Sequence, residues 1–202
     1  MKLFFFLPLL FLALTSQSSF AQTKKLLMLG DSLTEGLGVP RDAAYPALVE
    51  KKIKADGKNW QVINAGISGS TSASGPSRIK WQLKAKPDLV LLALGANDGL
   101  RGFKVKDMEK NLSQTIELVQ KEKIPLILAG MMMPPNYGAE YRKDFEQAFK
   151  RVAAKYKVPM IPFILDGVAG LPNLNQTDGI HPNEKGHEIV ADNVYKVLKS
   201  YL

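Results

Sequence analysis

Cysteine is absent from this chain of 202 residues. Without a thiol there is no disulfide framework, no thiolate nucleophile and no lipid attached through cysteine. Histidine is scarce: the chain has His181 and His187, so a mechanism that needs a histidine base must use one of these two. Runs of five basic residues and basic segments interleaved with aromatics are also missing, which argues against nucleic-acid binding.

A long apolar run occurs at the N-terminus. Lys2 precedes an apolar stretch at 3–14, and Ser19-Phe20-Ala21 places small residues at the two positions that signal peptidase reads. The run is short for a membrane span, which needs about 20 residues. We therefore expect residues 1–21 to be a signal peptide, cleaved near Ala21, and the protein to be exported to the periplasm or the medium. The alternative is a retained helix that anchors the chain.

The overall composition is that of a globular protein, with 46% hydrophobic and 23% charged residues. The net charge is +8, and its 27 Lys and Arg are spread along the chain. This balance favours transient contact with anionic surfaces such as phospholipid headgroups. Nothing in the sequence indicates an obligate protein partner.

Apolar runs alternate with amphipathic segments along residues 22–202. The apolar runs predict strands at 25–29, 61–63, 89–94, 125–129 and 160–164. The amphipathic segments predict helices at 43–56, 76–85, 108–119, 145–156 and 183–202. Apolar strands separated by amphipathic helices are typical of a parallel sheet covered on both faces. We predict a single α/β domain, a flavodoxin-like three-layer αβα sandwich with about five parallel strands.

Unusual polar and glycine-rich segments follow four of the predicted strands. In chain order they are Gly30-Asp31-Ser32-Leu33-Thr34-Glu35-Gly36, Gly66-Ile67-Ser68-Gly69-Ser70-Thr71, Gly95-Ala96-Asn97-Asp98-Gly99 and Asp178-Gly179-Ile180-His181-Pro182. The carboxyl ends of parallel strands share one edge of a sheet, where such folds bind their ligands. We expect these segments to meet there.

Nucleophilic serine catalysis needs a base near the hydroxyl, an acid that orients the base, and donors for the oxyanion. His181 lies three residues after Asp178, a separation that one turn closes, whereas His187 lies in the last predicted helix and is expected to be exposed. Structural alternatives stay open at this point. Ser32 and His181 are also suited to helix capping, and Asn97 and Gly69 to turns.

Taken together, these four segments resemble the sequence blocks of the SGNH, or GDSL, hydrolase family. Gly30-Asp31-Ser32-Leu33 resembles the first block, Gly69 the second, Gly95-Ala96-Asn97-Asp98 the third and Asp178 to Pro182 the last. Outside the blocks, Gly99 to Phe103 and Pro135 to Gly138 are similar to segments of exported thioesterases and lysophospholipases in that family. The Gly-x-Ser-x-Gly elbow of the α/β-hydrolases is absent.

The resemblance implies a serine esterase that hydrolyses carboxylic ester or thioester bonds of small acyl substrates. It implies a catalytic triad of Ser32, Asp178 and His181, and an oxyanion hole made by Ser32, Gly69 and Asn97. It implies no cofactor and no metal. The apolar residues that we expect to line the acyl site are Leu100, Phe103, Met133, Pro134, Tyr137 and Ile180. For Met131 and Met132, the end of a buried strand is an equal alternative.

Two other functions are compatible with parts of the pattern. One is a carbohydrate acetylesterase of the same fold. The other is a non-catalytic flavodoxin-like module in which residues 68–75 hold a phosphate through backbone N–H groups, but it leaves Asp178 and His181 without a role. A metal site at Asp178, His181 and His187 is disfavoured, because the spacing is not that of a helix-borne metal pair.

Overall fold

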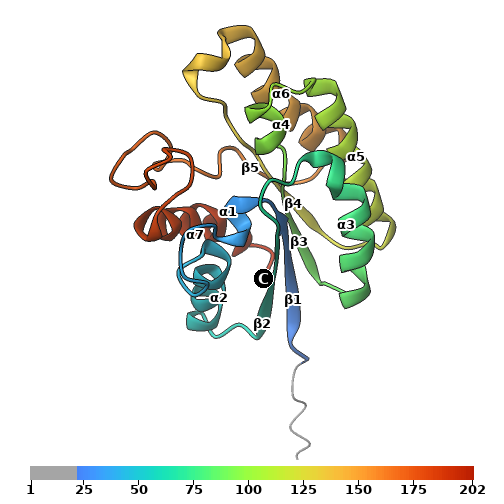
Figure 1. Ribbon diagram of the computed structural model, residues 1–202. Helices are drawn as coiled ribbons and strands as arrows, with labels where there is room; N and C mark the ends of the chain where they lie inside the picture. Colours follow the sequence, from blue (N-terminus) through green and yellow to red (C-terminus); the bar gives the residue numbers. More distant parts are fainter. Residues whose placement is uncertain (1–21) are drawn as a thin grey trace, which may run out of the picture.

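A computed structural model describes residues 22–202, which form one five-stranded parallel sheet with helices on both faces (Figure 1). The segment predicted to be a signal peptide lies outside the described residues. The strand order across the sheet is β2-β1-β3-β4-β5, and every neighbouring pair is parallel. The strands are β1 (Lys24–Gly30), β2 (Trp60–Gly66), β3 (Leu89–Ala93), β4 (Leu126–Ala129) and β5 (Met160–Ile161). The predicted αβα sandwich is confirmed.

Two layers of helices cover the sheet. Helices α2 (Tyr45–Ala55) and α7 (Glu184–Leu198) pack together on one face, and α3 (Gly75–Gln82), α5 (Val105–Lys121) and α6 (Ala139–Tyr156) on the other (Figure 1). Two short helices, α1 (Ser32–Glu35) and α4 (Ala96–Leu100), follow the carboxyl ends of β1 and β3. Within residues 22–202 no helix combines the length and apolar character that crossing a bilayer requires.

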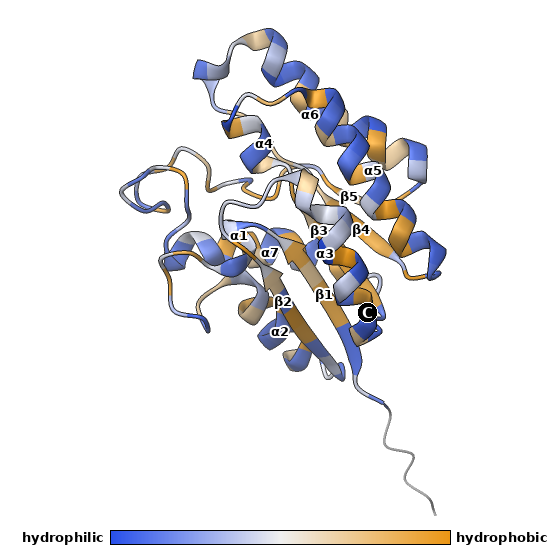
Figure 2. Ribbon diagram, turned by 45° about the vertical axis from the view of Figure 1, so that its right-hand side comes forward, coloured by the Kyte–Doolittle hydropathy of each residue, from blue (hydrophilic) through white to orange (hydrophobic). Residues whose placement is uncertain are grey.

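The core lies on both faces of the central strands. The side chains at 26–29 in β1 and 89–92 in β3 have no exposed area, and the middle of the sheet is hydrophobic in Figure 2. Because both faces of these strands are buried, their sequences are continuous apolar runs and do not alternate between apolar and polar residues. Ile53 of α2 and Ile116 of α5 are also fully buried.

The chain reverses its direction of winding at β1. From β1 it moves outward to β2, then returns across β1 to β3 and continues to β4 and β5. Ligands of open α/β sheets bind beyond the carboxyl ends of the strands at such a switch point. Ser32, at the start of α1, directly follows β1 at this position.

Several element boundaries differ from those predicted. Strand β5 has two residues instead of five, because Pro162 has no N–H to continue the ladder. The predicted helix at 76–85 ends at Gln82 and continues as a 3-10 turn, and α7 ends at Leu198 rather than at the C-terminus. Helix α4 was expected to be a loop, since its Gly95 and Gly99 favour turns.

The prediction that His187 is exposed is wrong. Its side chain is 1% exposed, in the first turns of α7 against α2. The ring of Tyr45 stacks on that of His187 with centroids 6.3 Å apart, and Nδ1 of His187 accepts the backbone N–H of Tyr45 at 3.2 Å. Burial lowers the pKa of His187 to about 4, with the charge of His181 adding to the effect. His187 is therefore a neutral core residue at neutral pH.

Candidate active site

Ser32 lies at the amino end of α1, directly after β1. Asp31 caps this helix by accepting the backbone N–H of Leu33 at 3.1 Å, and Gly36 ends it at a φ of 86°. Helix α1 sits against the end of β2 so closely that a Cβ on Gly66 would lie 2.1 Å from the backbone nitrogen of Glu35. A glycine at position 66 is thus needed for α1 to occupy this place.

His181 and Asp178 reach Ser32 from the loop that precedes α7. Nε2 of His181 lies 2.9 Å from Oγ of Ser32, and Nδ1 of His181 lies 2.7 Å from Oδ2 of Asp178. The other carboxylate oxygen of Asp178 accepts the backbone N–H groups of Ile180 at 2.9 Å and His181 at 3.0 Å. This chain of contacts has the geometry that a serine nucleophile, a base and an orienting acid require.

The charge on Asp178 is stabilised by these donors. Desolvation by burial opposes it, but hydrogen bonds from the backbone and ring of His181 and from the N–H of Ile180 lower the pKa of Asp178 to about 2. The carboxylate is therefore ionised at neutral pH and able to stabilise a positive imidazole.

The second and third loops are joined beside Ser32. The side-chain amide of Asn97 donates to the carbonyl of Ser70 at 3.1 Å, and Nη2 of Arg101 donates to the carbonyl of Gly69 at 3.0 Å. Gly69 has a φ of 74°, a conformation that favours glycine. The sequence indicated Gly69 and Asn97 but gave no role to Arg101, whose contact spans 32 positions.

Asp98 is a second residue whose role the sequence did not reveal. It is 4% exposed, and its two oxygens accept the backbone N–H and the hydroxyl of Ser72 at 2.7 and 2.6 Å. Asp98 thereby fixes the end of the second loop to α4, the helix that carries Asn97. The sequence feature that could have indicated a role for Asp98 is its position next to Asn97.

Asp31 is a buried carboxyl group next to Ser32. Its side chain is 2% exposed, and burial raises its pKa to about 6, although the N–H of Leu33 and the positive charges of His181 and Arg78 oppose this rise. In the sequence, Asp31 is notable only as part of the segment Gly30-Asp31-Ser32-Leu33. The structure shows a buried carboxyl group whose pKa is raised well above its ordinary value.

The six apolar residues predicted to line the acyl site differ in their exposure. Leu100 is half-buried and its carbonyl accepts the hydroxyl of Tyr137 at 2.9 Å, while Phe103 and Ile180 are 47% and 45% exposed. Pro134 is exposed beside Tyr137, but Met133 is 5% exposed and packs under Gly99. Of the six predicted acyl-site residues, Met133 thus supports the surface from below and the other five are accessible. Met131 is buried and Met132 is 38% exposed, both beyond the end of β4.

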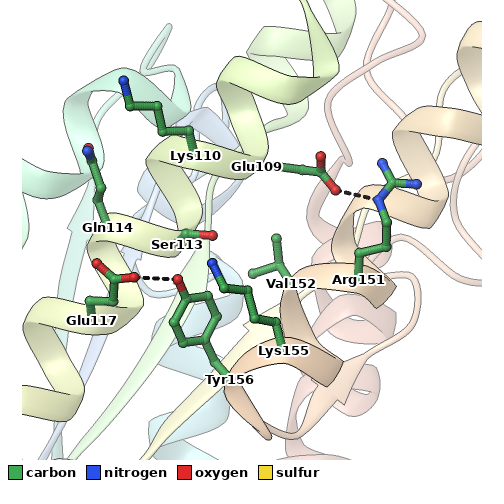
Figure 3. Close-up of a pocket in the computed structure, with 9 residues that line it drawn as sticks. All are labelled: Glu109, Lys110, Ser113, Gln114, Glu117, Arg151, Val152, Lys155 and Tyr156. Carbon is green, nitrogen blue, oxygen red and sulfur yellow. Dashed lines mark hydrogen bonds and ion pairs between the residues drawn. The ribbon is translucent and has the colours of Figure 1, made fainter.

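Two cavities lie in other places. A polar cavity of 470 Å³ opens between α5 and α6; its walls include Glu109, paired with Arg151 at 2.5 Å, and Tyr156 (Figure 3). None of the predicted site residues lines it. A cavity of 10 Å³, too small for a water molecule, lies among apolar side chains below α1, including Leu33 and Met131. Neither of these two cavities has Ser32, His181 or Asp178 among its lining residues.

Comparisons with known proteins agree with this geometry. Residues 28–189 match the model of the GDSL-like lipase/acylhydrolase family. The chain is 38% identical to esterase TesA of Pseudomonas aeruginosa over 192 residues, 95% of this chain and 94% of that protein. It is 39% identical to thioesterase 1/protease 1/lysophospholipase L1 of Escherichia coli K12 over 199 residues, 96% of this chain and 91% of that protein.

Solved structures show the same similarity. The crystal structure of TesA superimposes with a TM-score of 0.86 at 38% identity, covering 89% of this chain and all of that one. A psychrotrophic esterase, EstA from Pseudoalteromonas, superimposes with a TM-score of 0.84 at 34% identity, covering 88% of this chain and 98% of that one. That structure of EstA is inhibited by monoethylphosphonate.

Proposed function

Because the chain belongs to the GDSL-like lipase/acylhydrolase family and is an ester-hydrolysing enzyme, we propose that Ser32 is its nucleophile and His181 its general base, oriented by Asp178. One observation carries this assignment. Two elements 149 positions apart bring Nε2 of His181 to 2.9 Å from Oγ of Ser32, while Asp178 holds the opposite ring nitrogen. A capping or solvent-exposed histidine has no need of both contacts.

The reaction proceeds through an acyl-enzyme. His181 takes the proton of Ser32 as Oγ attacks the carbonyl carbon, and the bond to the leaving alcohol or thiol breaks as His181 returns that proton to it. Water then loses a proton to His181 and attacks the acyl carbon, and the acid leaves as Ser32 regains its proton. Asp178 fixes the ring of His181 and stabilises its positive charge in both steps.

The negative oxygen of each tetrahedral intermediate is held by three donors. They are the backbone N–H groups of Ser32 and Gly69 and the side-chain amide of Asn97. The bond from Asn97 to the Ser70 carbonyl uses one of its two amide hydrogens, which leaves the other for the oxyanion. Arg101 positions this loop through its bond to the carbonyl of Gly69.

The substrates are small acyl esters or thioesters whose acyl chain lies over Leu100, Phe103, Pro134, Tyr137 and Ile180, with Met133 below. The exposure of Phe103 and Ile180, at 47% and 45%, supports this placement. A carbohydrate acetylesterase of the same fold would instead require acetyl groups. The relatives named as a thioesterase and a lysophospholipase are further reason to include thioesters and lysophospholipids in the substrate class.

We also propose that residues 1–21 are removed at Ala21, that residues 22–202 act as a single exported domain, and that this domain contacts phospholipid surfaces. The leader pattern and the net charge of +8 support these proposals.

The deciding experiment measures hydrolysis of nitrophenyl esters, from acetyl to long acyl chains, by the wild type and by Ser32→Ala. We expect turnover by the wild type alone and a preference for chains longer than acetyl. Equal activity of Ser32→Ala would exclude Ser32 as nucleophile, and strict dependence on acetyl would favour the acetylesterase. Sedimentation of the protein with neutral and anionic vesicles tests the proposed lipid contact separately.

A further inference from the structure

A row of exposed lysines follows the edge of the sheet opposite Ser32. In sheet order these lysines are Lys58, Lys24, Lys86, Lys123 and Lys157, here called the lysine edge. Lys24 is the first residue of β1, and each of the other four lies two or three positions before the first residue of its strand. Since neighbouring strands are about 4.8 Å apart, the row is roughly 20 Å long. In the described part of the chain none of the five forms an ion pair.

The backbone at three of these lysines has a conformation that lysine disfavours. Lys86, Lys123 and Lys157 have φ values of 52°, 58° and 52°, and they are the positive-φ residues other than glycine within residues 22–202. The left-handed region brings Cβ close to the following carbonyl oxygen, so glycine and asparagine occupy it far more readily. All three strained positions of this kind fall on the lysine edge.

The same helix ending occurs in this chain with glycine. After α2, the N–H of Lys58 donates to the carbonyl of Ile53 at 3.2 Å, and the left-handed residue between them is Gly57. After α6, the N–H of Val158 donates to the carbonyl of Ala153 at 3.0 Å, and the left-handed residue is Lys157. This is the hydrogen bond of a Schellman motif, in which glycine is usual.

The helix dipole does not account for these strained lysines. A cation near a helix C-terminus is favourable, but Lys121 and Lys155, in the last turns of α5 and α6, provide it with helical backbone. Lys123 and Lys157 add further charge at positions where glycine is more relaxed. Carboxylates at this edge are fewer: Asp56, Asp88 and Glu122.

An exposed tryptophan accompanies the lysine edge. Trp81 lies in the last turn of α3, which runs toward this edge, and it is 66% exposed with Nζ of Lys84 lying 4.1 Å from its ring centroid. Tryptophan is enriched where proteins meet the headgroup layer of membranes, because its ring is apolar and its N–H polar. The basic residues here are lysines, which suit a diffuse anionic surface, whereas arginine prefers defined phosphate groups and nucleic acid.

We propose that the lysine edge and Trp81 form a docking face for an anionic phospholipid bilayer. This face refines the phospholipid contact proposed above; docking at it does not depend on the catalytic assignment, whereas its effect on hydrolysis rests on the proposed position of the active site. The amino ends of the strands then face the lipid, and α1, at the carboxyl end of β1, faces away from it (Figure 1). Ser32 begins α1, and His181 lies within hydrogen-bond distance of Ser32. The docked enzyme therefore hydrolyses soluble esters rather than the lipids that hold it.

The test compares two triple variants of the protein beginning at Gln22, each shown to be folded by cooperative unfolding in urea. Lys86→Gly/Lys123→Gly/Lys157→Gly removes three charges and relieves the backbone. Lys104→Gly/Lys106→Gly/Lys143→Gly removes three exposed lysines near the amino ends of α5 and α6, at the opposite edge. Binding is measured by sedimentation with vesicles of phosphatidylcholine alone, or with 30% phosphatidylglycerol, at low and physiological salt.

We expect the wild type to bind the anionic vesicles and not the neutral ones. The lysine-edge variant should bind them roughly a hundredfold more weakly, since each of the three lysines contributes about 1 kcal/mol near such a surface. The control variant should bind nearly as the wild type does. Tryptophan emission should shift to shorter wavelength on binding, and Trp81→Phe should abolish the shift; this variant is needed because Nζ of Lys24 lies 5.3 Å from the ring centroid of the second tryptophan, Trp60, which is 5% exposed. Hydrolysis of a soluble nitrophenyl ester should be unchanged on vesicles.

Three results would overturn the proposal: no binding to anionic vesicles, equal loss in the two triple variants, or loss of ester hydrolysis in the vesicle-bound enzyme. Duplex DNA is added as a competitor for the vesicles. If it displaces the protein fully from anionic vesicles, and the vesicles alone cause no shift of Trp81 emission, the lysine edge is a nucleic-acid site instead. Inactive Ser32→Ala that still binds vesicles would show that docking and catalysis are separate.

Discussion

The backbone N–H of Tyr45 donates to Nδ1 of His187 at 3.2 Å, across 142 positions of the chain. The hydroxyl of the same tyrosine lies 2.7 Å from that of Thr34, in the helix that Ser32 begins. A buried polar chain therefore connects α7, which follows His181, with α1. It gives the two sequence-distant parts of the proposed catalytic site, Ser32 and His181, a common support inside the protein.

His187 and Asp31 should give opposite pH dependences of stability. The pKa of His187 is about 4 in the folded state and 6.5 ordinarily, so the unfolded chain binds more protons between those values and the free energy of unfolding rises with pH. The pKa of Asp31 is about 6 when folded and 3.8 ordinarily, so the folded state binds more protons and the free energy of unfolding falls as pH rises through this range.

Because the two effects nearly cancel, we expect the wild type to show little change in the free energy of unfolding between pH 4 and 6. His187→Gln, which keeps an acceptor for Tyr45, should lose about 2 kcal/mol as pH rises over this range, and Asp31→Asn should gain about as much. Urea unfolding at pH 4 and pH 6 measures both. Parallel curves for the wild type and the two variants would contradict the assignment of these buried groups.

Asp178→Asn should lower kcat by roughly 10⁴-fold while the protein stays folded. The amide cannot stabilise a positive imidazole, and its NH₂ group favours the wrong ring tautomer of His181. Since the side chain of Asp178 is 44% exposed, its replacement should change the free energy of unfolding little. Stopped-flow hydrolysis of a nitrophenyl ester and urea unfolding measure the two quantities. Retention of more than a tenth of the wild-type kcat would show that another group orients His181.

Asn97→Ala should lower kcat by roughly a hundredfold or more, because it removes one of the three oxyanion donors that we propose. KM should change little, since the donor acts mainly on the charge that develops in the transition state. Asn173→Ala, at an exposed position, is the matched control. Steady-state kinetics on one ester gives both constants. A rise in KM with unchanged kcat would instead mean that Asn97 binds the ground-state substrate.

The sheet and the positions of the four polar segments were predictable, because continuous apolar runs identify buried strands. Three of the segments follow directly after a strand, and the fourth comes shortly before α7. The lengths of short elements were less accessible: β5 stops at Pro162, and α4 forms although Gly95 and Gly99 favour a turn. Contacts between distant segments left no local signal. The burial of His187 against Tyr45 and the bond from Arg101 to Gly69 depend on how α2 and α4 pack, which periodicity along one segment does not specify.

Gly66→Ala should reduce both stability and turnover, because it tests how closely α1 approaches β2. The added Cβ would lie 2.1 Å from the backbone nitrogen of Glu35 and 2.6 Å from the backbone carbon of Thr34. Backbone atoms cannot rotate away as a side chain does, so α1 must shift and carry Ser32 with it. We expect a loss of about 1–3 kcal/mol in the free energy of unfolding, as for other overpacked sites, together with a lower kcat.

Gly57→Ala is the control for this prediction, because the added Cβ meets nothing within 4 Å although φ is 71°. Its cost is backbone strain alone, about 1 kcal/mol, and it lies at the opposite edge of the sheet from Ser32. Urea unfolding should therefore show a loss in both variants, whereas kcat per folded molecule should fall only for Gly66→Ala. If Gly66→Ala kept the wild-type kcat, the position of Ser32 would not depend on the contact between α1 and β2. Loss of kcat in Gly57→Ala as well would mean that backbone strain in the turn between α2 and β2, far from Ser32, also lowers turnover.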